Sequence, residues 1–477
     1  MRLVASCYES LFFRKEIYKL KTDTIAAIAT AMSNAGLSII RISGENSLEI
    51  IDKIYSSKSG KKKISAQNSH TIHYGYIMDG EEIIDEVMVL LMKGPNSYTR
   101  EDVVEIDCHG GIVVTKKILE IIIKNGARPA EPGEFTKRAF LNGRIDLSQA
   151  EAVMDIINAK NDMALKSSVC QLKGNIHDKI VKERNIILRD IAFIEAALDD
   201  PEHIDIDGFS DELSKHVKQV IFDLNHLLET TDNGKILKEG IKTVILGKPN
   251  AGKSSLLNIL VGEDRAIVTD IEGTTRDTLE ESINLGGVIL NLIDTAGIRD
   301  TKDFVEKIGV EKAKETALDA DLIIYVVDAS RELDKNDEEI LRLMEGKKAI
   351  VLLNKMDLKP IIKREDLKLV TNQLIIEVSA IKREGIDTLE KSIEDMFFQG
   401  ELKFNDEIYI TNIRHKHGLE ESIKSLNQVI SSVELGMPED FYTIDLMNAY
   451  ESLGEIIGES VGEDLVNTIF REFCMGK

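Results

Sequence analysis

The stretch Gly247-Lys248-Pro249-Asn250-Ala251-Gly252-Lys253-Ser254 decides how this chain folds, because it fits the pattern G-x-x-x-x-G-K-[ST]. An apolar run at residues 244–246 precedes it and predicts a buried strand, and residues 255–260 after it predict a helix. In that order, the backbone N–H groups of the turn can surround a phosphate at a helix N-terminus. The stretch therefore predicts an α/β nucleotide-binding domain.

Within this loop, residue type suggests three roles. Lys253 is expected to neutralise charge on the β- and γ-phosphates, and the Ser254 hydroxyl to ligate Mg²⁺. Asn250 offers a side-chain oxygen that could hold a monovalent cation. The loop residues expected to contact the nucleotide are Asn250, Ala251, Gly252, Lys253, Ser254 and Ser255.

Two later segments predict that the base is guanine. Asn354-Lys355-Met356-Asp357 follows the strand-like residues 349–353, and Ser379-Ala380 follows residues 375–378. The Asp357 carboxylate can accept both N1–H and the exocyclic amine of guanine, whereas adenine offers neither and would leave a buried charge unpaired. The Ser379-Ala380 backbone fits a contact to the guanine O6.

Two segments between the phosphate loop and Asn354 are expected to face the γ-phosphate. Asp294-Thr295-Ala296-Gly297 ends the strand-like residues 288–293, so that Asp294 can hold the water shell of Mg²⁺. The earlier segment is Thr269-Asp270-Ile271-Glu272-Gly273-Thr274-Thr275-Arg276-Asp277. We expect Thr275 to close over Mg²⁺ and the γ-phosphate, with Thr274 as its competitor. The alternative is a polar turn before the next strand.

Ile298 stands where many GTPases carry a glutamine that orients the attacking water. Isoleucine can neither donate nor accept a hydrogen bond, so another group must do this work or the domain hydrolyses GTP poorly. Sequence alone does not choose among the nearby charges, each of which is an ordinary solvated side chain by default: Arg299, Asp300, Asp303 and Glu306.

Length and composition limit what surrounds this domain. A chain of 477 residues should hold about three domains. No apolar run reaches the roughly twenty residues of a membrane span, and the first 21 residues lack a signal-peptide core, so we expect a cytoplasmic protein.

The net charge of −23 opposes nonspecific nucleic-acid binding over most of the surface. The four cysteines show no zinc-site spacing, namely Cys7, Cys108, Cys170 and Cys474.

Apolar periodicity predicts an α/β and α fold with an inserted domain. Residues 22–140 alternate strand-like and helical stretches, whereas 141–237 and 399–477 show helical spacing with little proline. One helical domain built from both parts, with residues 238–398 inserted as a G domain, accounts for this pattern. Residues 1–21 are an extension, or the product of an upstream start codon.

The chain resembles the bacterial and organellar tRNA-modification GTPases of the MnmE (TrmE) family from about residue 22 onward. The resemblance rests on the C-terminal Cys474-Met475-Gly476-Lys477, on the Gly273 to Asp277 segment, and on Pro132-Gly133-Glu134-Phe135-Thr136-Lys137-Arg138-Ala139-Phe140-Leu141-Asn142. It implies an N-terminal tetrahydrofolate-binding-like domain that dimerises and holds a 5-formyl-tetrahydrofolate-type folate. The matching folate positions are Arg41, Glu105, Arg144 and Lys477. From sequence alone, Arg41 would be a strand residue facing solvent.

The resemblance also implies potassium activation, with Asn250, Thr269, Ile271 and Thr274 as matching ligands and Glu306 orienting the water. The implied partners are tRNA and a flavin- and NADH-dependent protein, MnmG (GidA), in a heterotetramer-type complex that modifies carbon 5 of the wobble uridine. The turn at residues 31–36 departs from the Gly- and Pro-rich family pattern.

Two questions stay open at this point. A ribosome-assembly or signalling GTPase would carry the same G-domain motifs. Cys474 could be a nucleophile beside the folate or a packed small residue.

Overall fold

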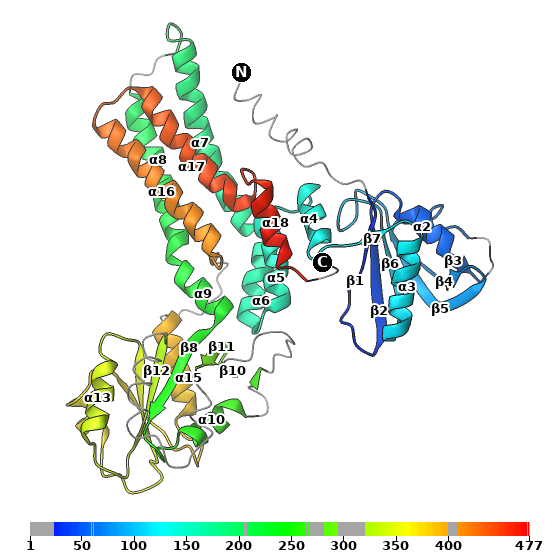
Figure 1. Ribbon diagram of the computed structural model, residues 1–477. Helices are drawn as coiled ribbons and strands as arrows, with labels where there is room; N and C mark the ends of the chain where they lie inside the picture. The colour runs from blue at the N-terminus through cyan, green and yellow to red at the C-terminus, as the bar shows by residue number, and fades with distance from the viewer. Residues whose placement is uncertain are drawn as a thin grey trace. The chain divides into compact units, whose positions relative to one another are not determined.

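A computed structural model describes residues 23–58, 60, 62–204, 208–262, 266–267, 281–293, 320–398, 408–474 and 476. The chain forms two compact units (Figure 1). The first contains residues up to 157, residues 169–225 and residues from 417 onward. The second contains residues 158–168 and 226–416.

A seven-stranded sheet forms the N-terminal part of the first unit, in the order β3-β4-β5-β6-β2-β1-β7. Neighbouring strands are antiparallel except β7, which runs parallel to β1. Helices α2 and α3 pack on this sheet (Figure 1). The elements are β1 Ile25–Ile28, β2 Ala35–Ser43, α2 Ser47–Ile54, β3 Tyr55–Ser57, β4 Thr71–Asp79, β5 Glu82–Met92, β6 Val103–Gly110, α3 Ile112–Lys124 and β7 Arg128–Pro129.

Alternation along the strands decides which face of this sheet is covered. Val87, Val89 and Leu91 of β5 point into the core, while Met88 between them is 38% exposed. On β4 the same uncovered face carries Tyr74, which lies opposite Met88 in the register. On β4 and β5, this face of the sheet therefore carries exposed apolar side chains.

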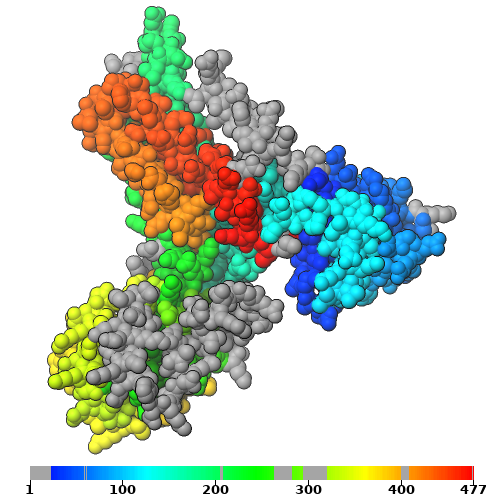
Figure 2. All heavy atoms as spheres, viewed as in Figure 1, coloured from blue at the N-terminus to red at the C-terminus, as the bar shows by residue number. Residues whose placement is uncertain are grey.

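Helices make up the described parts of the chain that showed helical spacing, as expected. They are α5 Leu147–Asn158, α6 Asp162–Leu172, α7 Asn175–Asp199, α8 Phe209–Glu229, α9 Thr231–Glu239, α16 Ile413–Glu434, α17 Glu439–Ile457 and α18 Glu463–Arg471, and they are preceded by α4 Glu134–Leu141. Helix α7 packs on α17, where the Arg184 guanidinium lies 3.9 Å from the Tyr450 ring centroid. Helix α18 packs on α4, and their surfaces touch in Figure 2.

The second unit is a P-loop domain around a seven-stranded sheet, in the order β14-β13-β12-β8-β11-β10-β9. Strands β8, β11, β12, β13 and β14 are parallel, and β10 is antiparallel to both of its neighbours. Its elements are β8 Ile241–Gly247, α10 Lys253–Val261, β9 Ala266–Ile267, β10 Glu281–Leu285, β11 Val288–Leu292, β12 Leu322–Asp328, α13 Lys335–Leu343, β13 Ala349–Asn354, α14 Arg364–Lys368, β14 Leu374–Glu377 and α15 Ile386–Phe398.

Strand β12, which the motif analysis did not single out, is buried on both faces. Ile324 and Val326 enter the apolar cluster that contains α10 and α15, while Ile323, Tyr325 and Val327 enter the cluster around α13. A sheet covered on both sides is typical of parallel α/β domains. Each fully buried apolar side chain contributes about 1.5–3 kcal/mol. The expected fold class is confirmed.

Candidate nucleotide site and tail site

The phosphate loop joins β8 to α10 through three left-handed backbone positions. The φ angle is 151° at Gly247, 64° at Asn250 and 102° at Gly252. A Cβ on Gly252 would lie only 2.1 Å from Nδ2 of Asn354. Glycine is therefore required at position 252 both by the backbone conformation and by the lack of space for a side chain. Asparagine tolerates the left-handed region better than most residues, which suits position 250.

Lys253 and Ser254 occupy the first turn of α10, where a helix N-terminus favours anions. The Lys253 ammonium donates to the carbonyl oxygens of Gly247 and Lys248 at 2.6 and 2.8 Å. Burial lowers the pKa of Lys253. The Ser254 side chain is exposed, as is that of Ser255. This geometry places a cation and a hydroxyl where a nucleotide phosphate and its Mg²⁺ would bind.

Asn354 connects the phosphate loop to the predicted base-binding segment. Its side chain is almost fully buried at the end of β13. Its Nδ2 donates to the Ala251 carbonyl at 2.9 Å, and its Oδ1 accepts from the Ala380 N–H at 3.1 Å. One amide therefore fixes the spacing between the phosphate loop and the predicted base-binding segment.

The remaining base-binding residues are held by side-chain hydrogen bonds. The Asp357 carboxylate accepts from the buried Ser379 hydroxyl at 2.7 Å. Lys355 donates to Asp328 at 2.6 Å. Burial by itself would raise the pKa of Asp328, but hydrogen bonds from Lys355 and Ser330 hold this pKa below its usual value. The hydrogen bond from Ser379 therefore holds the Asp357 carboxylate in place in the absence of a nucleotide.

Half of the predicted nucleotide and metal contacts lie outside the described residues. They are Thr269, Asp270, Ile271, Glu272, Gly273, Thr274, Thr275, Asp294, Thr295, Ala296, Gly297 and Glu306, and Lys477 at the C-terminus is also outside. Within the part of the chain that the structure describes, no three His, Cys, Asp or Glu residues cluster as metal ligands. Of the predicted metal ligands, only Asn250 and Ser254 can be placed.

Arg41 and Glu105 form a second site, in the first unit. They lie opposite each other on β2 and β6, and Arg41 Nε is 2.7 Å from Glu105 Oε1. Their side chains are only 14% and 16% exposed. The alternative that Arg41 faces solvent is therefore wrong. We call Arg41, Tyr98, Glu105, Phe135, Arg144 and Gly476 the tail site.

Two aromatic rings complete the tail site. The Arg41 guanidinium carbon lies 5.2 Å from the Tyr98 ring centroid and 5.5 Å from that of Phe135, and Arg144 lies 4.6 Å from Tyr98. Arg144 also donates to the Tyr98 carbonyl at 3.2 Å. The sequence analysis missed both rings as site residues. Phe135 lies within the family-specific stretch, but no periodicity marks Tyr98.

The C-terminal tail reaches this site. Arg41 donates to the Gly476 carbonyl at 3.2 Å across 435 positions of sequence. Gly476 is buried at φ 83°, and a Cβ there would lie 2.5 Å from the Ile28 carbonyl oxygen. Cys474 carries a free, exposed thiol, which does not support a role as a packed small residue.

Phe470 and Phe473 are buried in one cluster with Phe140. Beyond them, the Cys474 carbonyl accepts from the Gly133 N–H at 3.4 Å, and Gly476 is buried. The described tail therefore packs on the N-terminal part of the chain.

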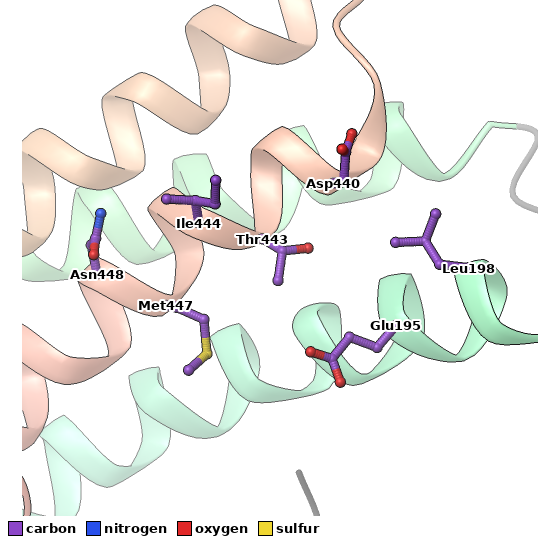
Figure 3. A pocket seen from close by; sticks show the side chains of 7 residues that line it. All are labelled: Glu195, Leu198, Asp440, Thr443, Ile444, Met447 and Asn448. Atoms are coloured by element: carbon purple, nitrogen blue, oxygen red, sulfur yellow. The ribbon is translucent and has the colours of Figure 1, made fainter. Parts of the chain in front are cut away.

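An open groove of about 420 Å³ lies between α7 and α17 (Figure 3). None of the residues lining it belongs to either site, and they are Glu195, Leu198, Asp440, Thr443, Ile444, Met447 and Asn448. The described helices include none that could cross a membrane.

Known proteins are similar to this chain over nearly its whole length. Residues 24–144 match the family described as the GTP-binding protein TrmE N-terminus, and residues 147–474 match the MnmE helical domain. A tRNA modification GTPase MnmE from Lachnoclostridium phytofermentans is 64% identical over 96% of this chain and 100% of that protein. Its counterpart in Clostridioides difficile is 52% identical over 95% and 99%. The chain belongs to the MnmE family of tRNA modification GTPases.

Proposed function

We propose that this chain is a potassium-activated GTPase that acts with a flavin-dependent MnmG-like protein on tRNA. The product is the 5-carboxymethylaminomethyl or aminomethyl group on the wobble uridine, position 34. One observation carries the GTP-binding part of this proposal: Asn354 bonds the phosphate loop and the Ala380 segment at once. The tRNA-modifying part is supported by relatives named for that activity over nearly their whole length.

The described residues fit the groups that this function needs. The exposed Ser254 hydroxyl at the start of α10 suits Mg²⁺, which would neutralise phosphate charge. Asn250 projects from a left-handed loop position, which suits a potassium ligand that would neutralise further charge. Glu306 would orient the attacking water. Asp357 would select guanine, and Lys253 would leave its loop carbonyls to reach the phosphates.

The tail site fits a folate. Its two arginines lie within cation–π distance of Tyr98, so that a flat ring and an anionic tail both find partners there. A folate would supply the one-carbon unit. Lys477 would add a cation near the anionic end, and Cys474 would present its exposed thiol next to that unit.

We also propose a homodimer, which exposed apolar side chains on β4 and β5 of the first unit support. Ile72 and Tyr74 of β4 are 64% and 51% exposed, and Met88 of β5 lies beside them. A second copy of the chain would bury these side chains. In sedimentation velocity we expect wild type to sediment as a dimer and Met88→Lys as a monomer.

Nucleoside mass spectrometry of tRNA from cells lacking the chain tests the proposed reaction. Loss of the modified wobble uridine, restored by the wild-type gene, is expected. Unchanged uridine with an accumulation of immature ribosomal subunits would instead support a ribosome-assembly GTPase.

A further inference from the structure

Lys248 is a variable position of the phosphate-loop pattern, and the nucleotide contacts considered above do not use its side chain. That side chain points away from the loop toward the start of α13. Its ammonium pairs with Asp334 and with Asp337, the latter at 3.0 Å. The Lys248 side chain is 17% exposed and that of Asp337 is 0% exposed. A buried ion pair therefore ties the loop to a neighbouring helix.

Asp337 is a rigid attachment point. Its carboxylate accepts from the Tyr325 hydroxyl at 2.5 Å, from Arg331 at 3.1 Å and from the Asp334 N–H at 3.0 Å. Asp334 and Asp337 also form the capping box of α13. Burial alone would raise the pKa of Asp337, but hydrogen bonds led by that from Tyr325 hold this pKa below its usual value. Tyr325 lies on the fully buried strand β12.

The loop needs such an attachment because its backbone is strained. Asparagine tolerates a left-handed conformation better than most residues, but at Asn250 this conformation still costs free energy, which contacts with the surrounding structure must offset. In this structure Lys253 helps by bonding the carbonyls of Gly247 and Lys248. When Lys253 binds the phosphates, it no longer donates to these two carbonyl oxygens. The ion pair between the Lys248 side chain and Asp337 does not involve Lys253 and is retained.

We propose that Lys248 is a positioning residue of the nucleotide site, which holds the phosphate loop in its anion-binding shape through the buried carboxylate of Asp337. The anchor acts on the bound nucleotide and on the transition state alike. Its loss should therefore raise KM for GTP and speed nucleotide release, with little change in kcat.

The test measures release of a fluorescent GDP analogue, methylanthraniloyl-GDP, from the full-length chain by stopped flow. Lys248→Met should release it about tenfold faster, since a hydrogen bond between charged groups is lost. Lys248→Arg keeps the charge and the reach and should restore release to within about twofold of wild type. Lys242→Met changes an exposed lysine on β8, the strand that leads into the loop, and should have no effect.

A double-mutant cycle separates positioning from general stability. Asp337→Asn should speed release, because it removes the buried pair with Lys248. Adding Lys248→Met then removes only the remaining pair with the more exposed Asp334 and should bring little further change. Tyr325→Phe removes the hydrogen bond from the Tyr325 hydroxyl to Asp337 but leaves the pair between Asp337 and Lys248. It should lower the melting temperature and leave nucleotide release near the wild-type rate, because Arg331 and the Asp334 N–H still hold the Asp337 carboxylate. Release from Lys248→Met at the wild-type rate, failure of arginine to restore it, or equal acceleration by Tyr325→Phe would each overturn the proposal.

Discussion

The nucleotide site and the tail site are built in opposite ways. In the nucleotide site the described residues come from short strings of neighbouring residues that follow the parallel strands β8, β13 and β14. In the tail site single residues come from two strands, a turn, a helix and the C-terminus, and Arg41 and Gly476 are 435 positions apart. The first site is local in sequence and the second is not.

This difference shows what a motif can report. The carboxyl ends of parallel strands meet at one edge of a sheet, so four strings in the right order predict a shared site. No comparable rule brings Arg41 to Tyr98, which only the packing of the tail and α4 on the first sheet decides. If the two sites are also independent in function, variants of one should leave the other intact.

The largest expected effect breaks the nucleotide site alone. Gly252→Ala would place a Cβ 2.1 Å from Asn354 at φ 102°, and should weaken GTP binding about a hundredfold or more. Equilibrium titration with a fluorescent GTP analogue measures this. Gly262→Ala, whose Cβ would meet its nearest atom at 3.4 Å, is the matched control. Retained folate binding by Gly252→Ala would confirm that the sites are separate.

Specificity for guanine depends on one carboxylate. Asp357→Asn should move preference from GTP to xanthosine triphosphate, because an amide can donate to the xanthine carbonyl. Loss of a hydrogen bond to a charged group costs about 1.5–3 kcal/mol, or roughly ten- to a hundredfold in GTP affinity. Competition binding with both nucleotides measures it, and Asp387→Asn on α15 serves as the control. Unchanged GTP affinity would contradict the assignment of the base site.

Potassium should accelerate GTP hydrolysis well beyond sodium. The radius of sodium is smaller, so oxygens arranged for potassium lie too far from it. Asn250→Ala should abolish the difference between the two salts. Glu306→Ala should lower kcat with little change in nucleotide affinity, as expected for a group needed in the transition state. Equal rates in potassium and sodium buffers would contradict the cation role of Asn250.

The tail site should respond to changes that the nucleotide site ignores. Arg41→Met removes the ion pair with Glu105 and the bond to Gly476, and should weaken folate binding about tenfold. Cys474→Ser, or a C-terminal tag, should lower wobble-uridine modification while GTP hydrolysis stays near normal. Arg100→Met, at an exposed arginine nearby, is the control. Full modification by a chain with a bulky tag would exclude the terminus from the site.

The smallest expected effect concerns pH. Burial alone would raise the pKa of Glu134, but hydrogen bonds from Arg128 and from the Glu131 N–H lower it. Glu134 therefore stabilises the folded state above the unfolded pKa of 4.5, and this stabilisation is lost as pH falls through the lower folded value. Hydrogen exchange of α4 amides, corrected for intrinsic rate, should show protection falling on acidification.

Glu134→Gln should reduce that protection at neutral pH by about 1–3 kcal/mol and remove most of its dependence on acid pH. Glu131→Gln changes an exposed neighbour and should retain the dependence. A pH profile that Glu134→Gln leaves unchanged would assign the effect to another carboxylate.

The sequence by itself determined the fold class and the local form of the phosphate loop. Residues 244–257 specify strand, turn and helix through neighbours alone, and glycine at 247 and 252 meets the backbone demands there. Apolar spacing likewise predicted α7 and α17, whose buried Ile191 and Leu446 lie on that period. Within α5, however, Ile157 at the same spacing is 42% exposed, since Leu147 and Ala150 form the buried face.

Only the tertiary structure decided which polar side chains leave the solvent. Arg41, Lys248 and Asp337 are ordinary charged residues in sequence, and no local rule distinguishes them from the solvated charges around them. Their partners come from distant elements, and burying a charge is tolerated only where such partners are supplied. That supply depends on how strands and helices pack, so the anchored loop and the tail site became visible only in three dimensions.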